Sequence, residues 1–542
     1  MTDTTESTLV AAASAAPLPV VSHWIDGAEY ASHSGRTAPV YNPALGVETK
    51  RVALADQAEI DAAIESAQRG FEVWSAYSIA KRQSVLFAFR ELLNSRKGEL
   101  AQIITSEHGK VLSDALGEIN RGQEVVELAT GFPQLTKGDY SEGASTGIDV
   151  YSIRQPLGVV GLISPFNFPA MVPMWFFPVA IAAGNAVVLK PSEKDPSASL
   201  WIAELWKEAG LPDGVFTVLQ GDKLAVDGLL NSPVVQSISF VGSTPIAQYI
   251  YETAAKNGKR VQALGGAKNH MLVLPDADLD LVADQAVNAG YGAAGERCMA
   301  VSVVLAVDGP LLAGSGASRS DGTAEPAGTV ADELIAKIAE RIERLKVGNG
   351  AGGPEGEPDL GPLISAEHKK KVSGYVDIAE ADGARIVVDG RACAVEGGED
   401  GFFFGPTLID DLPTTSRAYQ EEIFGPVLQV VRVKTFKEGV DLINSGQFGN
   451  GTAIFTNDGG AARRFQNEVQ VGMIGINVPI PVPVAYHSFG GWKKSLFGDA
   501  KAYGVHGFDF FTREKAVTSR WLDPAAQSSS HRGIDLGFPQ ND

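Results

Sequence analysis

The chain has 542 residues, of which 44% are hydrophobic and 20% are charged, as in a globular protein with two or three domains. Its net charge of -20 argues against nucleic acid and anionic membranes as partners, because both are bound through clustered positive charge. Its two cysteines cannot form a disulfide framework. Such a composition favours a reducing compartment, and we expect a cytoplasmic protein.

The two ends of the chain are expected to be tails, over residues 1–20 and 523–542. No Lys or Arg precedes Arg36, so the basic start of a secretory signal is missing. Further on, residues 155–189 carry no charge, but five prolines interrupt this segment. Because proline removes backbone donors, we expect buried strands and loops here rather than one membrane-spanning helix.

Two units of strand, loop, helix and strand follow. The first consists of "AVVLK" (186–190), "SASLWIAELWKEAG" (197–210) and "GVFTVLQG" (214–221). The second begins with "VVQSISFV" (234–241) and continues in a helix that Pro245 opens, with Ser243 or Thr244 as its cap. Strands that alternate with helices indicate a parallel sheet with helices on both faces, so the fold class is α/β.

Another αβ section is expected over residues 279–483, with surface loops rich in Gly, Ser and Pro at 311–330 and 348–362. Two segments, 145–160 and 504–521, have the β-branched and aromatic character of extended strands. An exposed edge strand pairs readily with another subunit, so we expect these two segments to join copies of the chain.

More specific information comes from six short blocks: "SPFNFP" (164–169), "KPSE" (190–193), "FVGST" (240–244), "LGG" (264–266), "GERC" (295–298) and "EEIFGPV" (421–427). In these blocks and their order the chain resembles the aldehyde dehydrogenase superfamily over residues 24–521. Within it, "ALGGAKNH", "RCMA" and "SFGGWKKSLFGDAKAYGVHGFDFFTREK" are similar to the methylmalonate-semialdehyde dehydrogenase branch.

The resemblance implies three parts. They are a Rossmann-type NAD-binding domain (21–142 and 160–278), an αβ catalytic domain (279–483) and a small β oligomerisation element (143–159 and 484–522). Pairing through that element would give a homodimer or a homotetramer.

Cys298 follows a run of Gly and Ala and stands directly after Glu296 and Arg297. An isolated free cysteine is commonly a small buried hydrophobe, but these neighbours favour a nucleophile. The resemblance implies that Cys298 attacks an aldehyde and that a thioester forms on it. It also implies that Asn167 stabilises the oxyanion together with the Cys298 backbone N–H, although an Asn between prolines can simply form a turn. Cys393 has no such neighbours and is expected to be inert.

No G-x-G-x-x-G fingerprint follows a strand, so the common dinucleotide motif is absent. In its place the resemblance implies an adenosine-ribose site at Lys190, Ser192, Glu193 and Lys194. Without the resemblance, a Lys and a Glu in a loop would be a solvated ion pair.

The remaining cofactor contacts also come from the resemblance. Ser243, at a helix start, is suited to the pyrophosphate, or it serves only as the helix cap. Contacts to the nicotinamide half of NAD are implied for Ser164, Phe166, Gly265, Glu422 and Phe424.

Ala263 departs from most of the superfamily, which has a Glu immediately before "LGG" as the base that activates water. Alanine cannot accept a proton, so we expect the thioester to wait for the thiol of coenzyme A, the co-substrate of this branch. The alternative is that another carboxylate, such as Glu296 or Glu422, supplies the base and the thioester is hydrolysed.

Arg297 and Arg121 resemble the pair that binds the substrate carboxylate in this branch, a task that suits the guanidinium group. Two alternatives stay open. Arg121 could be a surface helix residue paired with Glu118 or Glu124, and Arg297 could act only to lower the pKa of Cys298.

The eight histidines are scattered, so no metal site is expected, and the aromatic residues of "MVPMWFFPVAI" are expected in the core. The function that the resemblance implies is NAD-dependent, CoA-acylating oxidative decarboxylation of methylmalonate or malonate semialdehyde to propionyl-CoA or acetyl-CoA. The alternatives are a hydrolytic NAD(P)-dependent dehydrogenase of another aldehyde, or a catalytically silent homologue that acts as a binding protein.

Overall fold

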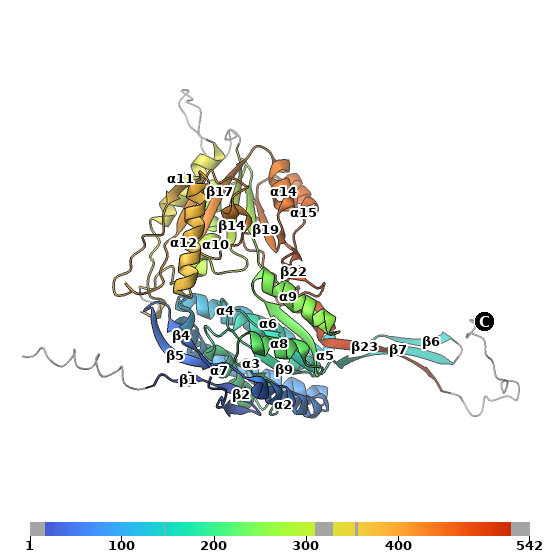
Figure 1. Cartoon of the computed structure of the whole chain (residues 1–542). Helices are drawn as coiled ribbons and strands as arrows, with labels where there is room; N and C mark the ends of the chain where they lie inside the picture. Colours follow the sequence, from blue (N-terminus) through green and yellow to red (C-terminus); the bar gives the residue numbers. More distant parts are fainter. Residues whose placement is uncertain (1–16, 146, 309–328, 353–355, 522–542) are drawn as a thin grey trace, which may run out of the picture.

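The computed structural model describes residues 17–145, 147–308, 329–352 and 356–521. The expected tail over 523–542, most of the tail over 1–20 and nearly all of the 311–330 loop lie outside the described residues. Figure 1 shows three parts: two sheets with their helices, one above the other, and a narrow ribbon that extends to one side. This arrangement confirms the α/β fold class.

The lower part contains an eight-stranded sheet. In spatial order its strands are β22 (Leu496–Phe497), β12 (Arg260–Leu264), β11 (Val235–Val241), β8 (Val159–Ile163), β9 (Ala186–Lys190), β10 (Phe216–Val218), β2 (His23–Ile25) and β3 (Ala28–Tyr30). The five strands from β12 to β10 are parallel. Chain order reverses between β8 and β11, and ligands of such sheets bind beyond the strand ends at this reversal.

Both expected strand and helix units are confirmed. The first runs from β9 through α7 (Ser197–Glu208) to β10, and the second from β11 through α9 (Thr244–Lys256) to β12. Ser243 is the N-cap residue of α9, and Pro245 lies in its first turn, where a missing N–H is harmless.

Helices cover the eight-stranded sheet on both faces (Figure 1). One face packs against α2 (Gln57–Ser75), α8 (Lys223–Asn231) and α9. The other packs against α3 (Ile79–His108), α4 (Leu112–Thr130), α6 (Met171–Ala183) and α7. Burial on both faces explains why β8 is apolar throughout and why β9 is apolar up to its last residue, Lys190.

The expectation of only strands and loops over residues 155–189 is wrong, because α6 lies there. Pro173 stands in its first turn, where no intrahelical donor is needed, whereas Pro178 lies inside the helix, which is buried on all sides. The first N–H groups of α6 are bonded by the carboxylate of Glu118, which accepts from Ala170 at 3.0 Å and from Met171 at 3.1 Å. None of the helices in the described ranges is both long and apolar enough to cross a membrane.

The upper part contains a seven-stranded sheet. Its strands in spatial order are β15 (Arg385–Val388), β16 (Thr407–Asp410), β17 (Val427–Val433), β14 (Val301–Val307), β13 (Asn269–Val273), β19 (Gly451–Phe455) and β20 (Met473–Ile476). One face packs against α10 (Leu279–Tyr291) and α11 (Val330–Ile342). The other packs against α12 (Ala366–Ala381), α14 (Phe436–Ser445) and α15 (Gly459–Glu468). β13 precedes the expected domain boundary at residue 279 but belongs to this sheet.

The ribbon is a three-stranded sheet of β6 (Tyr140–Ser145), β7 (Ile148–Pro156) and β23 (Thr512–Arg520), in the order β23-β7-β6 (Figure 1). The extended structure expected over 145–160 is therefore confirmed for β7. Over 504–521 it is confirmed only for β23, because residues 504–511 form helix α16 (Gly504–Phe511). The aromatic side chains of α16 pack on α6, so burial overrides strand propensity here.

Several small elements complete the described residues. They are β1 (Val20–Val21), β4 (Thr37–Asn42), β5 (Val47–Ala53), α5 (Phe132–Leu135), α13 (Arg417–Gln420), β18 (Phe448–Gly449), β21 (Trp492–Lys493) and two short 3-10 turns at Gly292–Gly295 and Gly350–Gly352.

Candidate active site

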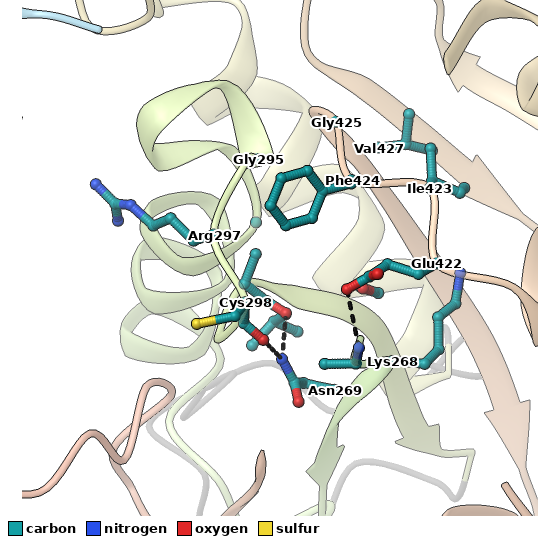
Figure 2. A pocket seen from close by; sticks show the side chains of 15 residues that line it. Lys268, Asn269, Gly295, Arg297, Cys298, Glu422, Ile423, Phe424, Gly425 and Val427 are labelled. Carbon is teal, nitrogen blue, oxygen red and sulfur yellow. Dashed lines mark hydrogen bonds between the residues drawn. The ribbon is translucent and has the colours of Figure 1, made fainter. Parts of the chain in front are cut away.

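Cys298 lies where the two sheets meet, on the turn between α10 and β14. It lines a larger cavity of about 570 Å³ and a smaller cavity of about 190 Å³. A narrow space of about 10 Å³ separates its backbone from Glu422 and Phe424 (Figure 2). In Figure 2 the sulfur points away from Glu422, towards the side on which Arg297 lies. One thiol therefore faces two separate binding spaces.

The turn before Cys298 has an unusual backbone. Ala293 and Ala294 adopt left-handed conformations, with φ angles of 49° and 52°. Residues with a Cβ avoid this region, and strain of this kind is concentrated at functional sites. The Cys298 carbonyl is held by two side-chain amides, from Asn269 at 2.9 Å and Asn450 at 3.1 Å. These bonds fix the position of the sulfur.

The thiol is held in its neutral form. Burial and the nearby Glu422 carboxylate raise the pKa of Cys298 to about 12, while the charge of Arg297 acts in the opposite direction. Among these causes the effect of Arg297 is the weakest. An effect on the pKa of Cys298 alone is therefore too weak to explain why an arginine stands beside the nucleophile.

Asn167 is buried beside Cys298 in the wall of the smaller cavity. Its amide nitrogen donates to the backbone carbonyl of Glu296 at 2.9 Å. A primary amide has two N–H groups, so this bond orients the side chain and leaves the second N–H for another acceptor. Asn167 therefore does more than form a turn.

The two arginines line the larger cavity together. Arg121 binds both carboxylate oxygens of Glu124 at 2.9 Å and also donates to the carbonyl of Pro483 at 3.0 Å. The pairing with Glu124 that helix spacing favours is therefore present, whereas Glu118 pairs with Lys110 instead. Arg121 thus pairs with Glu124 and lines the larger cavity at the same time.

Arg297 forms an ion pair with Asp114 at 2.7 Å, and its guanidinium lies where a side chain at Gly292 would otherwise be. The pair leaves other N–H groups of the guanidinium available to a ligand. Asp114, Glu118 and Arg121 follow one another at spacings of four and three residues, so one stripe of α4 faces the cavity.

The smaller cavity is lined by five of the residues expected at the cofactor, together with the expected oxyanion donor Asn167. The five are Phe166, Ser243, Gly265, Glu422 and Phe424. Glu422 accepts the N–H of Ala267 at 2.8 Å. A Cβ on Gly266 would come within 2.5 Å of the Glu422 carboxylate, so the second glycine of "LGG" is required. Phe424 has a positive φ of 61°, and its carbonyl accepts from His368 at 2.6 Å.

Two hydroxyl groups near this cavity are free to bind a ligand. The Ser164 Oγ is buried and has no hydrogen-bond partner among the described residues. The Ser243 side chain makes no capping bond to α9 within the same residues, so simple N-capping does not explain it. These two serines follow β8 and β11, the strands between which chain order reverses.

The expected ribose residues gather at the end of the neighbouring strand β9. The buried Lys190 forms an ion pair with the half-exposed Glu193 at 3.2 Å, and the Ser192 hydroxyl accepts the N–H of Lys194 at 3.1 Å. The Lys190 carbonyl accepts the N–H of Ser164, which joins this group to the first residue of "SPFNFP". The pair is thus not simply solvated, because Lys190 is buried.

Ala263 is fully buried on β12 and packs in the core beneath α9. It does not line the larger, smaller or narrow space around Cys298. Of the two alternative bases, Glu422 lines the smaller cavity, whereas the Glu296 carboxyl is buried behind it between His108 and His368. Burial raises the pKa of Glu296 to about 8.

Several residues of the site were not expected from the sequence. Met171 and Trp175 are buried as predicted for core residues, but they also line the larger cavity. His368 and Lys371 of α12 line the smaller cavity. No local signal marks them, because their roles arise from packing between distant segments. Within the described ranges, no group of His, Cys, Asp and Glu could hold a metal ion.

Comparison with known proteins agrees with this geometry. The model of the aldehyde dehydrogenase family matches residues 30–310 and 327–517. A malonate-semialdehyde dehydrogenase of Pseudomonas aeruginosa is 51% identical, over 95% of this chain and 99% of that protein. One from Geobacillus kaustophilus is 45% identical, over 92% of this chain and 98% of that protein.

Two solved structures are similar over nearly their whole length. A methylmalonate-semialdehyde dehydrogenase of Oceanimonas doudoroffii matches with a TM-score of 0.88 and 50% identity, over 94% of this chain and 100% of that one. A Sinorhizobium meliloti protein assigned to the same activity, in complex with NAD, matches with a TM-score of 0.89 and 47% identity. The match covers 94% of this chain and 99% of that one. The chain belongs to the aldehyde dehydrogenase family.

Proposed function

We propose that the protein is an NAD-dependent, CoA-acylating dehydrogenase that converts malonate or methylmalonate semialdehyde, with loss of carbon dioxide, to acetyl-CoA or propionyl-CoA. The observation that carries the proposal is the position of Cys298 between a cavity with two arginines and a second cavity with the expected cofactor residues. The names of the similar proteins support the same substrates.

The residues present fit NAD. Among the described residues the Ser164 hydroxyl has no partner and the Ser243 side chain makes no capping bond, so both hydroxyls are suited to its polar groups. A Cβ on Gly265 would come within 2.5 Å of the Lys494 carbonyl, so only glycine allows the close packing beside α9. We assign Lys190, Ser192, Glu193 and Lys194 to the adenosine ribose, Ser243 to the pyrophosphate, and Ser164, Phe166, Gly265, Glu422 and Phe424 to the nicotinamide half. When bound, NAD supplies the acceptor for hydride.

The first chemical step takes place at Cys298. The thiol first loses its proton to solvent, the thiolate sulfur then adds to the aldehyde carbon, and the carbonyl π pair moves onto the oxygen, which becomes an oxyanion. The second N–H of Asn167 and the backbone N–H of Cys298 would donate to this oxyanion. Departure of hydride from the adduct leaves an acyl group on Cys298 as a thioester.

The substrate carboxylate is assigned to Arg121 and Arg297 in the larger cavity. In the thioester this carboxylate stands on the carbon next to the thioester carbonyl. Its bond to that carbon breaks, carbon dioxide leaves, the electron pair is delocalised into the thioester carbonyl, and a solvent proton then returns to the carbon.

Release of the acyl group requires a nucleophile. Ala263 cannot accept a proton, and it packs in the core rather than facing the thioester. The thiol of coenzyme A therefore attacks the carbonyl, and Cys298 leaves as the thiolate. A hydrolytic enzyme is the second candidate, because Glu422 lines the smaller cavity with Cys298 and could act as a base.

The β6, β7 and β23 ribbon is proposed as the contact between subunits of a homodimer or homotetramer. It extends away from both large sheets (Figure 1), and Tyr140 and Ile153 on it are exposed. The two free cysteines support a cytoplasmic enzyme. Light scattering of the purified chain measures the number of subunits.

Formation of NADH from malonate semialdehyde, with and without CoA, tests the proposed reaction. Repeated turnover that depends on CoA is the expected result, with acetyl-CoA as the product. Equal turnover without CoA would identify a hydrolytic enzyme, and absence of even a single burst of NADH would identify a silent homologue. Cys298→Ala should abolish the burst.

A further inference from the structure

Asp114 contacts two parts of the site at once. One carboxylate oxygen binds the guanidinium of Arg297 at 2.7 Å, and the other accepts the N–H of Ala293 at 3.1 Å. Ala293 is the first of the two residues with left-handed backbone, and Arg297 directly precedes Cys298. A single side chain thus holds both the strained turn and the arginine that flank the nucleophile.

The position of Asp114 is itself well defined. It stands in the first turn of α4, where a negative charge is favoured by the helix dipole. α4 also carries Glu118, whose carboxylate bonds to the start of α6, and Arg121, which bonds to the carbonyl of Pro483. The helix is therefore anchored on both sides of the larger cavity, and Asp114 is held by a rigid element.

We infer that Asp114 is a positioning residue that aims the guanidinium of Arg297 at the substrate carboxylate and, through its second oxygen, holds the turn before Cys298. The inference rests on the proposed function, because it concerns an anionic aldehyde. The ion pair leaves part of the guanidinium free, and a charge-assisted bond restricts its orientation more than a neutral one does.

Asp114→Asn separates the two roles. An asparagine has only one acceptor oxygen, and the fixed N–H of Ala293 competes for it. The amide N–H₂ group then faces the guanidinium of Arg297, donor against donor, and the guanidinium turns away. Asp114→Ala removes both contacts.

The readout is the single burst of NADH in the absence of CoA, measured against aldehyde concentration. Malonate semialdehyde is compared with propanal, a neutral aldehyde of the same chain length. For Asp114→Asn we expect the half-saturating concentration of malonate semialdehyde to rise about tenfold, the effect of one lost charge-assisted bond, with propanal changed less than about twofold. For Asp114→Ala the burst rate should fall with both aldehydes.

The amplitude of the propanal burst counts the correctly folded enzyme in each preparation. Asp280→Asn is the matched control, because Asp280 forms ion pairs with Lys337 and Arg341 at the surface, at the end of α10 opposite to the turn that carries Cys298. It should leave both aldehydes unchanged.

A double-mutant cycle shows whether Asp114 acts through Arg297. If it does, Asp114→Asn adds little to the loss caused by Arg297→Gln. Additive losses, or an equal effect of Asp114→Asn on both aldehydes, would overturn the inference. If Arg297→Gln itself leaves the preference for malonate semialdehyde intact, the proposed carboxylate site is wrong, and that result is distinguishable from a failure of Asp114 alone.

Discussion

Alkylation of Cys298 in the ligand-free enzyme measures whether the site holds its thiol in the neutral form. Burial and the Glu422 carboxylate raise the pKa of this thiol to about 12, whereas an unperturbed cysteine has a pKa of about 8.5. Because the pKa is raised, only about one thiol in 10⁴ is ionised at pH 8, and the thiolate is the reactive form. The rate with iodoacetamide should therefore rise about tenfold per pH unit between pH 7 and pH 10, without a plateau.

The assay uses a Cys393→Ser background, so that the thiol of Cys298 is the one that is modified. In this background Glu422→Gln removes the charge that raises the pKa, and alkylation at pH 8 should become severalfold faster. Glu421→Gln is the matched control, since the neighbouring Glu421 carboxylate is paired with Arg417. A plateau below pH 9, or equal acceleration by both variants, would refute the reasoning.

Three further predictions concern stability, cofactor binding and rate. The raised pKa of Glu296 means that the folded state holds a proton that the unfolded state releases, so stability is lost as pH rises from about 4.5 to about 8. Glu296→Gln should remove this loss, so that the drop in the free energy of unfolding in urea between low pH and pH 8 becomes smaller by at most about 5 kcal/mol. Parallel pH profiles of the free energy of unfolding for the two proteins would contradict it. Gly266→Ala should displace the Glu422 carboxylate and weaken NAD binding about tenfold in a fluorescence titration; unchanged binding would contradict it. Asn167→Ala should slow the NADH burst about 10²-fold to 10³-fold; a smaller loss than tenfold would exclude it from the oxyanion site.

Much of the NAD-binding sheet could be predicted from local patterns. β9, α7, β11 and α9 follow from apolar runs that glycines and prolines interrupt at their ends, and these signals depend on neighbouring residues only. The short motifs predicted Cys298 and five of the ten expected cofactor residues that line the smaller cavity together. Their chemical roles stay predictions until the variants above are measured.

Long-range contacts explain what the sequence patterns missed. α6 exists despite two prolines because the Glu118 carboxylate, 52 positions before Ala170, bonds to its first N–H groups. α16 is helical because its aromatic residues pack on α6. No local pattern marks Asp114, because only the fold brings it to Arg297, 183 positions away.

The central claim is that the acyl group on Cys298 persists until a thiol removes it. Its most direct test is the intact mass of the enzyme, quenched at intervals after mixing with NAD and malonate semialdehyde in CoA-free buffer. We predict that the acyl adduct stays on Cys298 for many times the turnover time measured with CoA, and that it disappears at once when CoA is added. Loss of the adduct without CoA at the rate of steady-state turnover would contradict the account.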